Sequence, residues 1–156
     1  MKKLLLVLLL LGFIQSNIFA QLSTSSAFGV RYVVPTGTTA DVYDNGFGIT
    51  GSANFSVIPI LDIMIEGSWH VLKMKDLGVL NDMLNENLSI SGLVVGPVLT
   101  LGFVDVGIKG GYFFGDVSEW AVFPFAQIDV LMFSVGAEYK AVGNTKWAAA
   151  YLNFNF

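Results

Sequence analysis

The sequence predicts an all-β fold, an eight-stranded antiparallel up-and-down transmembrane β-barrel. The chain is 54% hydrophobic, yet beyond its leader no stretch reads as a spanning helix, which needs about 20 apolar residues. Apolar and polar residues alternate in eight segments, as they do in strands that separate two environments. The alternation runs to the last residue, Phe156, where an unpaired strand would aggregate in water but would close a barrel in a membrane.

The first twenty residues have the pattern of a secretory signal peptide. Lys2 and Lys3 precede an apolar run, and Ala20 is a small residue at the expected cleavage point. Ile18 is larger than usual near such a site, so the cleavage position stays open, and an uncleaved anchor is the alternative. Cleavage after Ala20 leaves residues 21–156 as a single membrane-embedded β-barrel domain. The chain has no cysteine, so strand pairing rather than disulfides must hold this exported domain together.

The first half of the chain contains three expected strands with clear alternation. They lie over residues 26–34, 46–57 and 61–71. A polar loop over 35–45 follows the first strand, a tight turn over 58–60 follows the second, and the longest loop, over 72–87, follows the third. This last loop has room for a short helix over 77–84.

The second half contains five more expected strands. The fourth begins near Leu88 and ends before Pro97, because Gly96-Pro97 is a common turn signal. The others are expected over 103–114, 120–126, 130–140 and from 146 to the end of the chain. The connections between them are expected at 115–119, 127–129 and 142–145.

The lengths of the connections predict the orientation of the barrel. Those after the first and third strands are long, whereas those after the second, fourth and sixth are shorter. In bacterial outer-membrane barrels the short turns are periplasmic and the longer loops extracellular. We therefore expect both termini on the periplasmic side.

Large amphipathic aromatic residues gather near the outer ends of the expected strands. They are Tyr32, Trp69, Tyr112, Trp120, Tyr139 and Trp147. Tyrosine and tryptophan favour the boundary between lipid and water, so these residues are expected to form one aromatic girdle. Trp147 is out of phase with the apolar face of its strand, and is assigned to the point where that strand begins.

The leader, the eight amphipathic strands and the terminal segment Tyr151-Leu-Asn-Phe-Asn-Phe156 resemble one known group. They are similar to the small eight-stranded outer-membrane barrels of Gram-negative bacteria, the OmpA/OmpX-like proteins. The resemblance covers the whole mature chain. It implies a barrel surrounded by outer-membrane lipid. It also implies that the barrel assembly machinery recognises the terminal strand through Leu152, Phe154 and Phe156 during insertion.

Charged residues are predicted to fill the barrel interior. Arg31, Glu66 and Lys109 face inward at similar heights, and Glu138 faces inward nearer the outer rim. The lumen of an eight-stranded barrel is just wide enough for side chains, and unpaired buried charges are costly. We expect an ion-pair cluster that plugs the lumen; the alternative is that the cluster gates a narrow pore.

Other kinds of site have little support in the sequence. Glu66, Ser68 and His70 share one strand face, as in a lipid-modifying hydrolase, but such neighbours lie about 6.5–7 Å apart, beyond hydrogen-bond reach. No catalytic residue is therefore assigned. The sequence has no His or Cys cluster for a metal and no phosphate-binding glycine loop, so no cofactor is expected. Acidic residues outnumber basic ones by 12 to 8, which argues against nucleic acid as a partner.

The function expected from these features is structural or interactive rather than enzymatic. The loops over 35–45 and 72–87 are the expected contact points for an extracellular partner. The alternatives are a narrow porin-like channel, a barrel that binds a small molecule or lipid, and a secreted lipocalin-like barrel. The last of these would need a mostly polar outer face.

Overall fold

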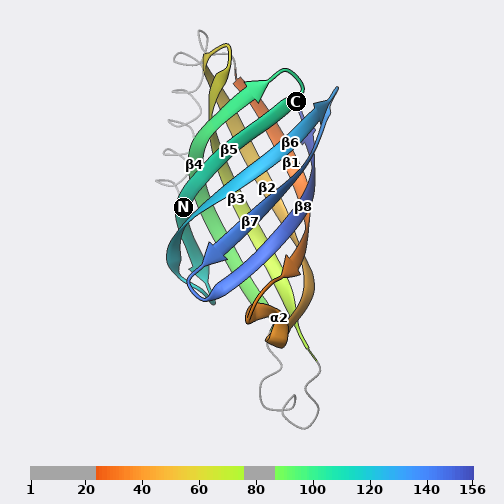
Figure 1. Ribbon diagram of the computed structural model, residues 1–156, viewed down its shortest axis with the longest axis vertical. Coiled ribbons are helices and arrows are strands. Elements are labelled where there is room, and N and C mark those ends of the chain that lie inside the picture. Colours follow the sequence, from red (N-terminus) through yellow and green to blue (C-terminus); the bar gives the residue numbers. More distant parts are fainter. Residues whose placement is uncertain (1–23, 76–86) are drawn as a thin grey trace, which may run out of the picture.

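The computed structural model describes residues 24–75 and 87–156. Its eight strands form one closed barrel, in which each strand pairs antiparallel with its neighbours in sequence and the last strand closes against the first (Figure 1). This confirms the predicted fold class. The expected signal peptide over 1–20 and the expected helix over 77–84 lie outside the described residues.

The strands agree with the predicted segments in number and order. They are β1 Thr24–Pro35, β2 Tyr43–Ile58, β3 Leu61–Met74, β4 Leu88–Leu101, β5 Val104–Gly115, β6 Glu119–Val130, β7 Phe133–Val142 and β8 Thr145–Asn155. A single helical turn, α2 Thr39–Val42, lies between β1 and β2. No helix among the described residues is long and apolar enough to cross a membrane.

The two ends of the barrel differ in their connections. At one end, here called the turn end, strands are joined by two-residue turns at 59–60, 102–103 and 131–132. At the other, the loop end, the connections are 36–42, 75–87, 116–118 and 143–144. In Figure 1 the loop end with α2 is at the bottom and the chain's C-terminus is at the top.

Both ends of the barrel sequence meet at the turn end. Ser26 of β1 and Phe156 exchange two backbone hydrogen bonds, with N···O distances of 3.0 and 2.8 Å. The register between β1 and β8 then continues from Ala27 opposite Asn155 to Pro35 opposite Trp147. The last residue therefore completes the seam that closes the barrel.

Two predicted turns are wrong, because the chain continues as strand through both. Pro97 lies inside β4, and the turn comes five residues later at 102–103. Pro97 has no amide hydrogen, and the ladder to β5 skips from Val95 opposite Gly110 to Val98 opposite Gly107. Residues 127–129 likewise belong to β6, where Gln127 and Asp129 point into the barrel instead of forming a turn.

The strand alternation sorts side chains into a filled interior and an apolar exterior. Along β6, for example, buried Ala121, Phe123 and Phe125 alternate with exposed Val122 and Pro124. Large exposed hydrophobic side chains occur on every strand. Such an exterior is the reverse of a soluble barrel's and matches a surface that lies in lipid.

Candidate functional site

A layer of charged side chains crosses the middle of the lumen. Arg31 comes from β1, Glu66 from β3, Lys109 from β5, and Glu138 and Lys140 from β7. Each is almost fully buried. These strands are next-but-one neighbours in the barrel, so the layer is built by side chains that reach across the lumen.

The two carboxylates of this charged layer bind all three cations. Glu66 Oε2 lies 2.7 Å from both Arg31 Nη2 and Lys109 Nζ. Glu138 lies 3.2 Å from Arg31 Nε, 2.8 Å from Lys140 Nζ and 3.4 Å from Lys109 Nζ. The four residues expected to form an ion-pair cluster thus lie together. The Glu138 carboxylate thus reaches two of the same cations as that of Glu66.

Aromatic rings accommodate the excess positive charge. The charged layer has three cations and two carboxylates, which leaves a formal charge of +1. The guanidinium of Arg31 lies 4.3 Å from the ring centre of Tyr151. Lys109 Nζ lies 4.5 Å from the Phe125 centre, and Lys140 Nζ lies 4.7 Å from that of Phe123. Cation–π attraction of this kind is strongest where water is excluded.

Sequence reasoning missed Lys140, although a signal for it was present. Lys140 follows Glu138 by two residues in the same strand, so both must point to the same side. Its Nζ also lies 3.2 Å from Nε2 of His70. Lys140 therefore connects the charged layer to His70, which lies on the loop-end side of that layer beside Trp147.

His70 and Ser68 do not form a hydrolytic site. Both are buried in the lumen on β3. Ser68 Oγ and His70 Nδ1 have no hydrogen-bond partner within the described part of the chain. A serine nucleophile needs a base within hydrogen-bond reach, and this serine has none.

An apolar layer fills the lumen between the charged layer and the loop end. Its largest members are Trp147, Phe113, Phe123, Leu72 and Ile90. The rings of Phe113 and Trp147 meet edge to face with centres 6.3 Å apart, and Trp147 lies 5.9 Å from His70. The placement of Trp147 in the outer girdle is therefore wrong. Its odd-numbered position in β8 points inward, and the strand is already regular there.

Helix α2 covers the loop end of the barrel. The buried Thr39 Oγ1 accepts a hydrogen bond of 2.8 Å from the backbone N–H of Lys146 in β8. The Lys75 side chain donates to the carbonyl of Ala40, and the Lys75 backbone N–H donates to Val42. The connection between β1 and β2 is thereby held to β8 and to the residue that follows β3, on the loop-end side of the apolar layer.

Polar side chains line the lumen at the turn end. Gln127 Nε2 donates to Asp105 and Asp129 at 3.0 and 3.2 Å, and Tyr151 donates to Gln127 Oε1 at 3.2 Å. Within the described residues, no group of three or more His, Cys, Asp or Glu side chains is arranged to hold a metal ion. This region is a hydrogen-bonded polar lining.

The other predicted girdle residues lie on the outer surface. Tyr32, Trp69, Tyr112, Trp120 and Tyr139 are all exposed. Asn45 donates a hydrogen bond of 2.7 Å to the Tyr32 hydroxyl, and Trp69 Nε1 donates one of 2.9 Å to Ser89 Oγ. Tyr112 and Trp120 face each other across β5 and β6 with ring centres 5.7 Å apart.

The residues of the predicted assembly signal also face outward. Leu152, Phe154 and Phe156 are exposed on β8 and its end. Phe154 stacks on Phe156 and meets Phe133 of β7 edge to face, at ring-centre distances of 6.2 and 5.6 Å. The terminal strand thus presents a continuous aromatic edge beside the barrel seam.

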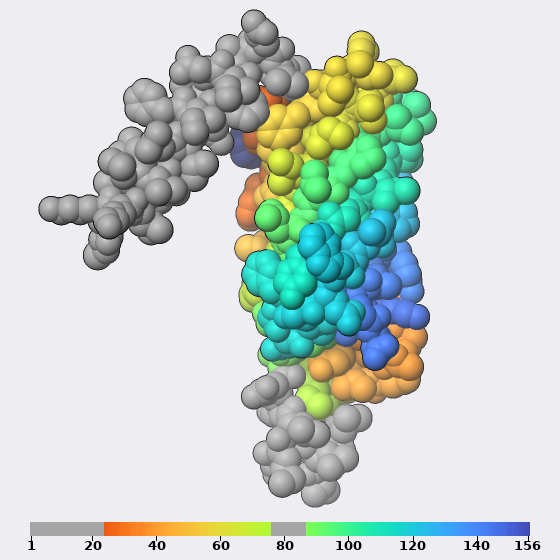
Figure 2. All heavy atoms as spheres, turned by 90° about the vertical axis from the view of Figure 1, so that its left-hand side faces the viewer, coloured from red at the N-terminus to blue at the C-terminus, as the bar shows by residue number. Residues whose placement is uncertain are grey.

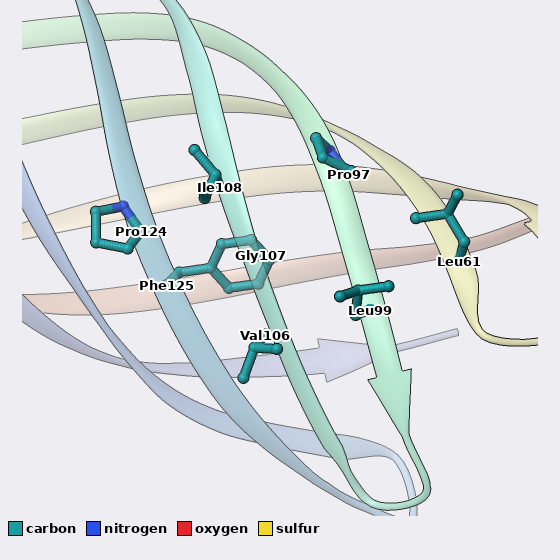
Figure 3. A pocket seen from close by; sticks show the side chains of 8 residues that line it. All are labelled: Leu61, Pro97, Leu99, Val106, Gly107, Ile108, Pro124 and Phe125. Carbon is teal, nitrogen blue, oxygen red and sulfur yellow. The ribbon is translucent and has the colours of Figure 1, made fainter.

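The exterior also has a hollow of about 460 Å³ in its turn-end half. Figure 3 shows its lining side chains, which come from β3 to β6 and include Pro97, Leu99, Ile108 and Pro124. Phe125, whose ring packs over Gly107, forms part of its floor. This hollow opens on the apolar outer face and is not part of the lumen.

Solved structures support the fold assignment. No protein family model matches the chain, and no curated protein matches it significantly. The crystal structure of Ail, the attachment invasion locus protein of Yersinia pestis, matches with a TM-score of 0.62 at 12% identity, over 85% of this chain and 97% of that one. Neisserial surface protein A matches with a TM-score of 0.58 at 11% identity, over 86% and 97%.

Two further structures of Ail are similar to this chain. One is the outer membrane protein Ail in a phospholipid bilayer nanodisc, with a TM-score of 0.54 and 14% identity over 86% of this chain and all (100%) of that one. Another is Ail with the heparin analogue sucrose octasulfate, with a TM-score of 0.51 and 16% identity over 86% and 97%. The chain therefore has the fold of the small eight-stranded outer-membrane barrels.

Proposed function

We propose that this chain is an integral outer-membrane barrel that does not conduct solutes and has a structural or interaction role. One observation carries the proposal: two successive layers of side chains, one charged and one apolar, cross the lumen. The charged layer holds its five members by ion pairs of 2.7 to 3.4 Å. The apolar layer, on the loop-end side of the charged layer, contains the fully buried Trp147, Phe113 and Leu72.

These two layers make the narrow-channel alternative less favourable. An ion that passed through would have to separate paired buried charges and then cross an apolar layer, and both steps are costly. The exposed apolar exterior likewise argues against a secreted lipocalin-like barrel, which would expose such residues to water.

Conductance measurements test this proposal directly. The purified protein, reconstituted in planar bilayers, should produce no discrete current steps, while an open porin in the same bilayers provides the positive control. Heat-modifiable gel migration must show that the sample is folded. Reproducible steps from the folded protein would overturn the plugged lumen and favour a narrow channel.

The cellular location of the protein and its orientation in the membrane are part of the same proposal. Cleavage after Ala20 would release the signal peptide over 1–20 and leave both termini in the periplasm with the turn end. The barrel assembly machinery would recognise the outward-facing side chains of Leu152, Phe154 and Phe156. Sequencing the membrane-extracted protein from its N-terminus should begin at Gln21; a start at Met1 would show an uncleaved anchor.

The loop end is the surface that an extracellular partner would meet, through the loops over 35–45 and 72–87. Among the described residues, its exposed charges are four carboxylates and two lysines: Asp41, Asp44, Asp116, Glu119, Lys73 and Lys146. This balance disfavours a sulfated ligand of the kind bound to Ail. Titration with sucrose octasulfate should therefore show no saturable binding; saturable binding would indicate a similar ligand class here.

A further inference from the structure

The turn end of the barrel has an unusually apolar surface. Its three two-residue turns and their flanks expose large hydrophobic side chains, here called the collar: Ile58, Ile60, Leu101, Phe103, Leu131 and Met132. Two-residue hairpin turns are usually built from Gly, Asn and Asp. In Figure 2 the β2–β3 turn, in yellow, forms the upper tip of the barrel.

Leu131 is the clearest member of the collar. It is 96% exposed and adopts a left-handed backbone conformation with φ of 57°. That conformation suits glycine or asparagine and costs other residues about 1 kcal/mol. A fully exposed leucine at such a position gains nothing from the rest of the barrel, so its side chain indicates an apolar environment outside the protein.

The distribution of charged side chains among the described residues also distinguishes the two ends of the barrel. Every exposed charged side chain among the described residues lies at the loop end. At the turn end the carboxylates are Asp62, Asp105 and Asp129, and all three belong to the inward-facing side of their strands. Apart from the terminal carboxylate of Phe156, the outside of the turn end therefore has no exposed charged group among the described residues.

The height of the apolar band gives a second, independent argument. Within strands, eight residues separate Trp69 from Leu61, and eight separate Tyr112 from Val104. This is about 26 Å along a strand and about 20 Å along the axis of a barrel with tilted strands. The lipid-facing band of such barrels is about 25 Å tall. The turns must supply the remaining height.

We propose that the collar is a lipid-inserting surface that lies among the acyl chains at the boundary of the periplasmic leaflet. The collar is continuous with the lipid-facing exterior: Leu61 and Leu99 of the outer hollow lie directly beside Ile60 and Leu101. The proposal rests on the membrane insertion proposed above and adds that the turns do not emerge into water.

Single cysteines provide a direct test, because the chain has none of its own. A label at Leu131→Cys reports the environment of the collar. A label at Asn144→Cys is a matched control, because Asn144 lies in the two-residue turn at the opposite end of β7. Val30→Cys, on the exposed face of β1, reports insertion itself. Each is labelled with an environment-sensitive fluorophore in phosphatidylcholine vesicles, and then quenched by acyl-brominated lipid or by aqueous iodide.

We expect brominated lipid to quench the labels at 131 and 30 to a similar extent, and iodide to quench the label at 144 several-fold more than either. Quenching at 30 but iodide access at 131 would overturn the collar alone. Shielding of 131 from both quenchers would show a protein partner or a second copy there, and would also overturn it. Absence of lipid quenching at 30 would overturn both proposals.

Discussion

The charged layer depends on the number of carboxylates it contains. Glu66 contacts Arg31 and Lys109 at 2.7 Å each, so Glu66→Gln leaves Glu138 to compensate three cations. Removal of one partner from a buried pair costs about 3–5 kcal/mol. We expect a loss of unfolding free energy of this size, measured by urea denaturation of the reconstituted barrel.

The matched control for Glu66→Gln removes a cation as well. The double variant Glu66→Gln/Lys109→Gln restores the original excess of one cation and should recover part of the lost stability. A loss below about 1 kcal/mol for the single variant, as for an exposed pair, would show that the layer is solvated.

Trp147 fixes the apolar layer, whereas Trp69 lies on the outer surface. Trp147 is fully buried and packs on Phe113 and His70. Its replacement by alanine should cost about 3–5 kcal/mol, because a buried aromatic leaves a cavity. Trp69→Ala should cost clearly less, since lipid fills the space. Equal losses in the same denaturation experiment would contradict this assignment of inside and outside.

The sequence could predict the lumen residues only in part. Period-two alternation correctly assigns the inward side of β1, β3, β5 and β7, which is why Arg31, Glu66, Lys109 and Glu138 meet. It does not give the stagger between strands, so it could not predict that Glu138 contacts the same two cations, Arg31 and Lys109, as Glu66 does. Trp147 belongs to the lumen because its phase in the strand, not the preference of tryptophan for interfaces, decides which way it points.

At the level of elements, α2 should stay in place over the loop end because Thr39 is hydrogen-bonded to β8. Thr39→Val removes the hydrogen bond to Lys146 N–H, and leaves that partly buried group unpaired at a cost of about 1 kcal/mol. Amide hydrogen exchange over 36–42 should become faster. Thr38→Val is the matched control, because Thr38 is exposed and its side chain makes no capping bond. The same exchange rates in both variants would show that the cap is not held by Thr39.

The terminal strand should be more important for insertion than for any later activity. A chain that ends at Asn155 loses the two backbone bonds to Ser26 and the ring that stacks on Phe154. We expect less of the heat-modifiable folded form in the membrane fraction. Phe156→Leu keeps the backbone bonds and an apolar side chain, so it should insert better than the truncated chain. Normal insertion of the truncated chain would argue against an assembly signal.

The strands were easier to predict than the turns, and the reason is physical. Apolar alternation arises from the two environments of the barrel wall, so it marks all eight strands. Turn prediction assumes that turns are polar and rich in Gly, Asn or Asp. Here Leu131-Met132 is an apolar turn, whereas Pro97 and Asp129 lie within strands. At Pro97 the wall simply loses one ladder bond.

For the whole molecule, the two ends are built for different surroundings. The loop end has the exposed charges and the Tyr and Trp girdle, while the turn end has phenylalanine, leucine and isoleucine on its outside. Phenylalanine has no polar group to hold at an interface, so the turn end has no second girdle. The barrel therefore has an aromatic girdle at one membrane interface only. At the other end, the collar sets how far the lipid-facing surface extends along the barrel axis.

This geometry predicts that stability depends on bilayer thickness. From Trp69 to the collar the apolar exterior spans little more than 20–25 Å of the barrel axis. Mismatch costs a fraction of a kcal/mol per ångström, and the bacterial outer membrane is thinner than average. In phosphatidylcholine vesicles of increasing acyl length, urea resistance should reach a maximum in thin bilayers and then fall. Replacement of Phe103 and Leu131 by asparagine should shift this maximum to still thinner bilayers. Resistance that rises steadily with acyl length in both proteins would contradict a collar seated at the lipid boundary.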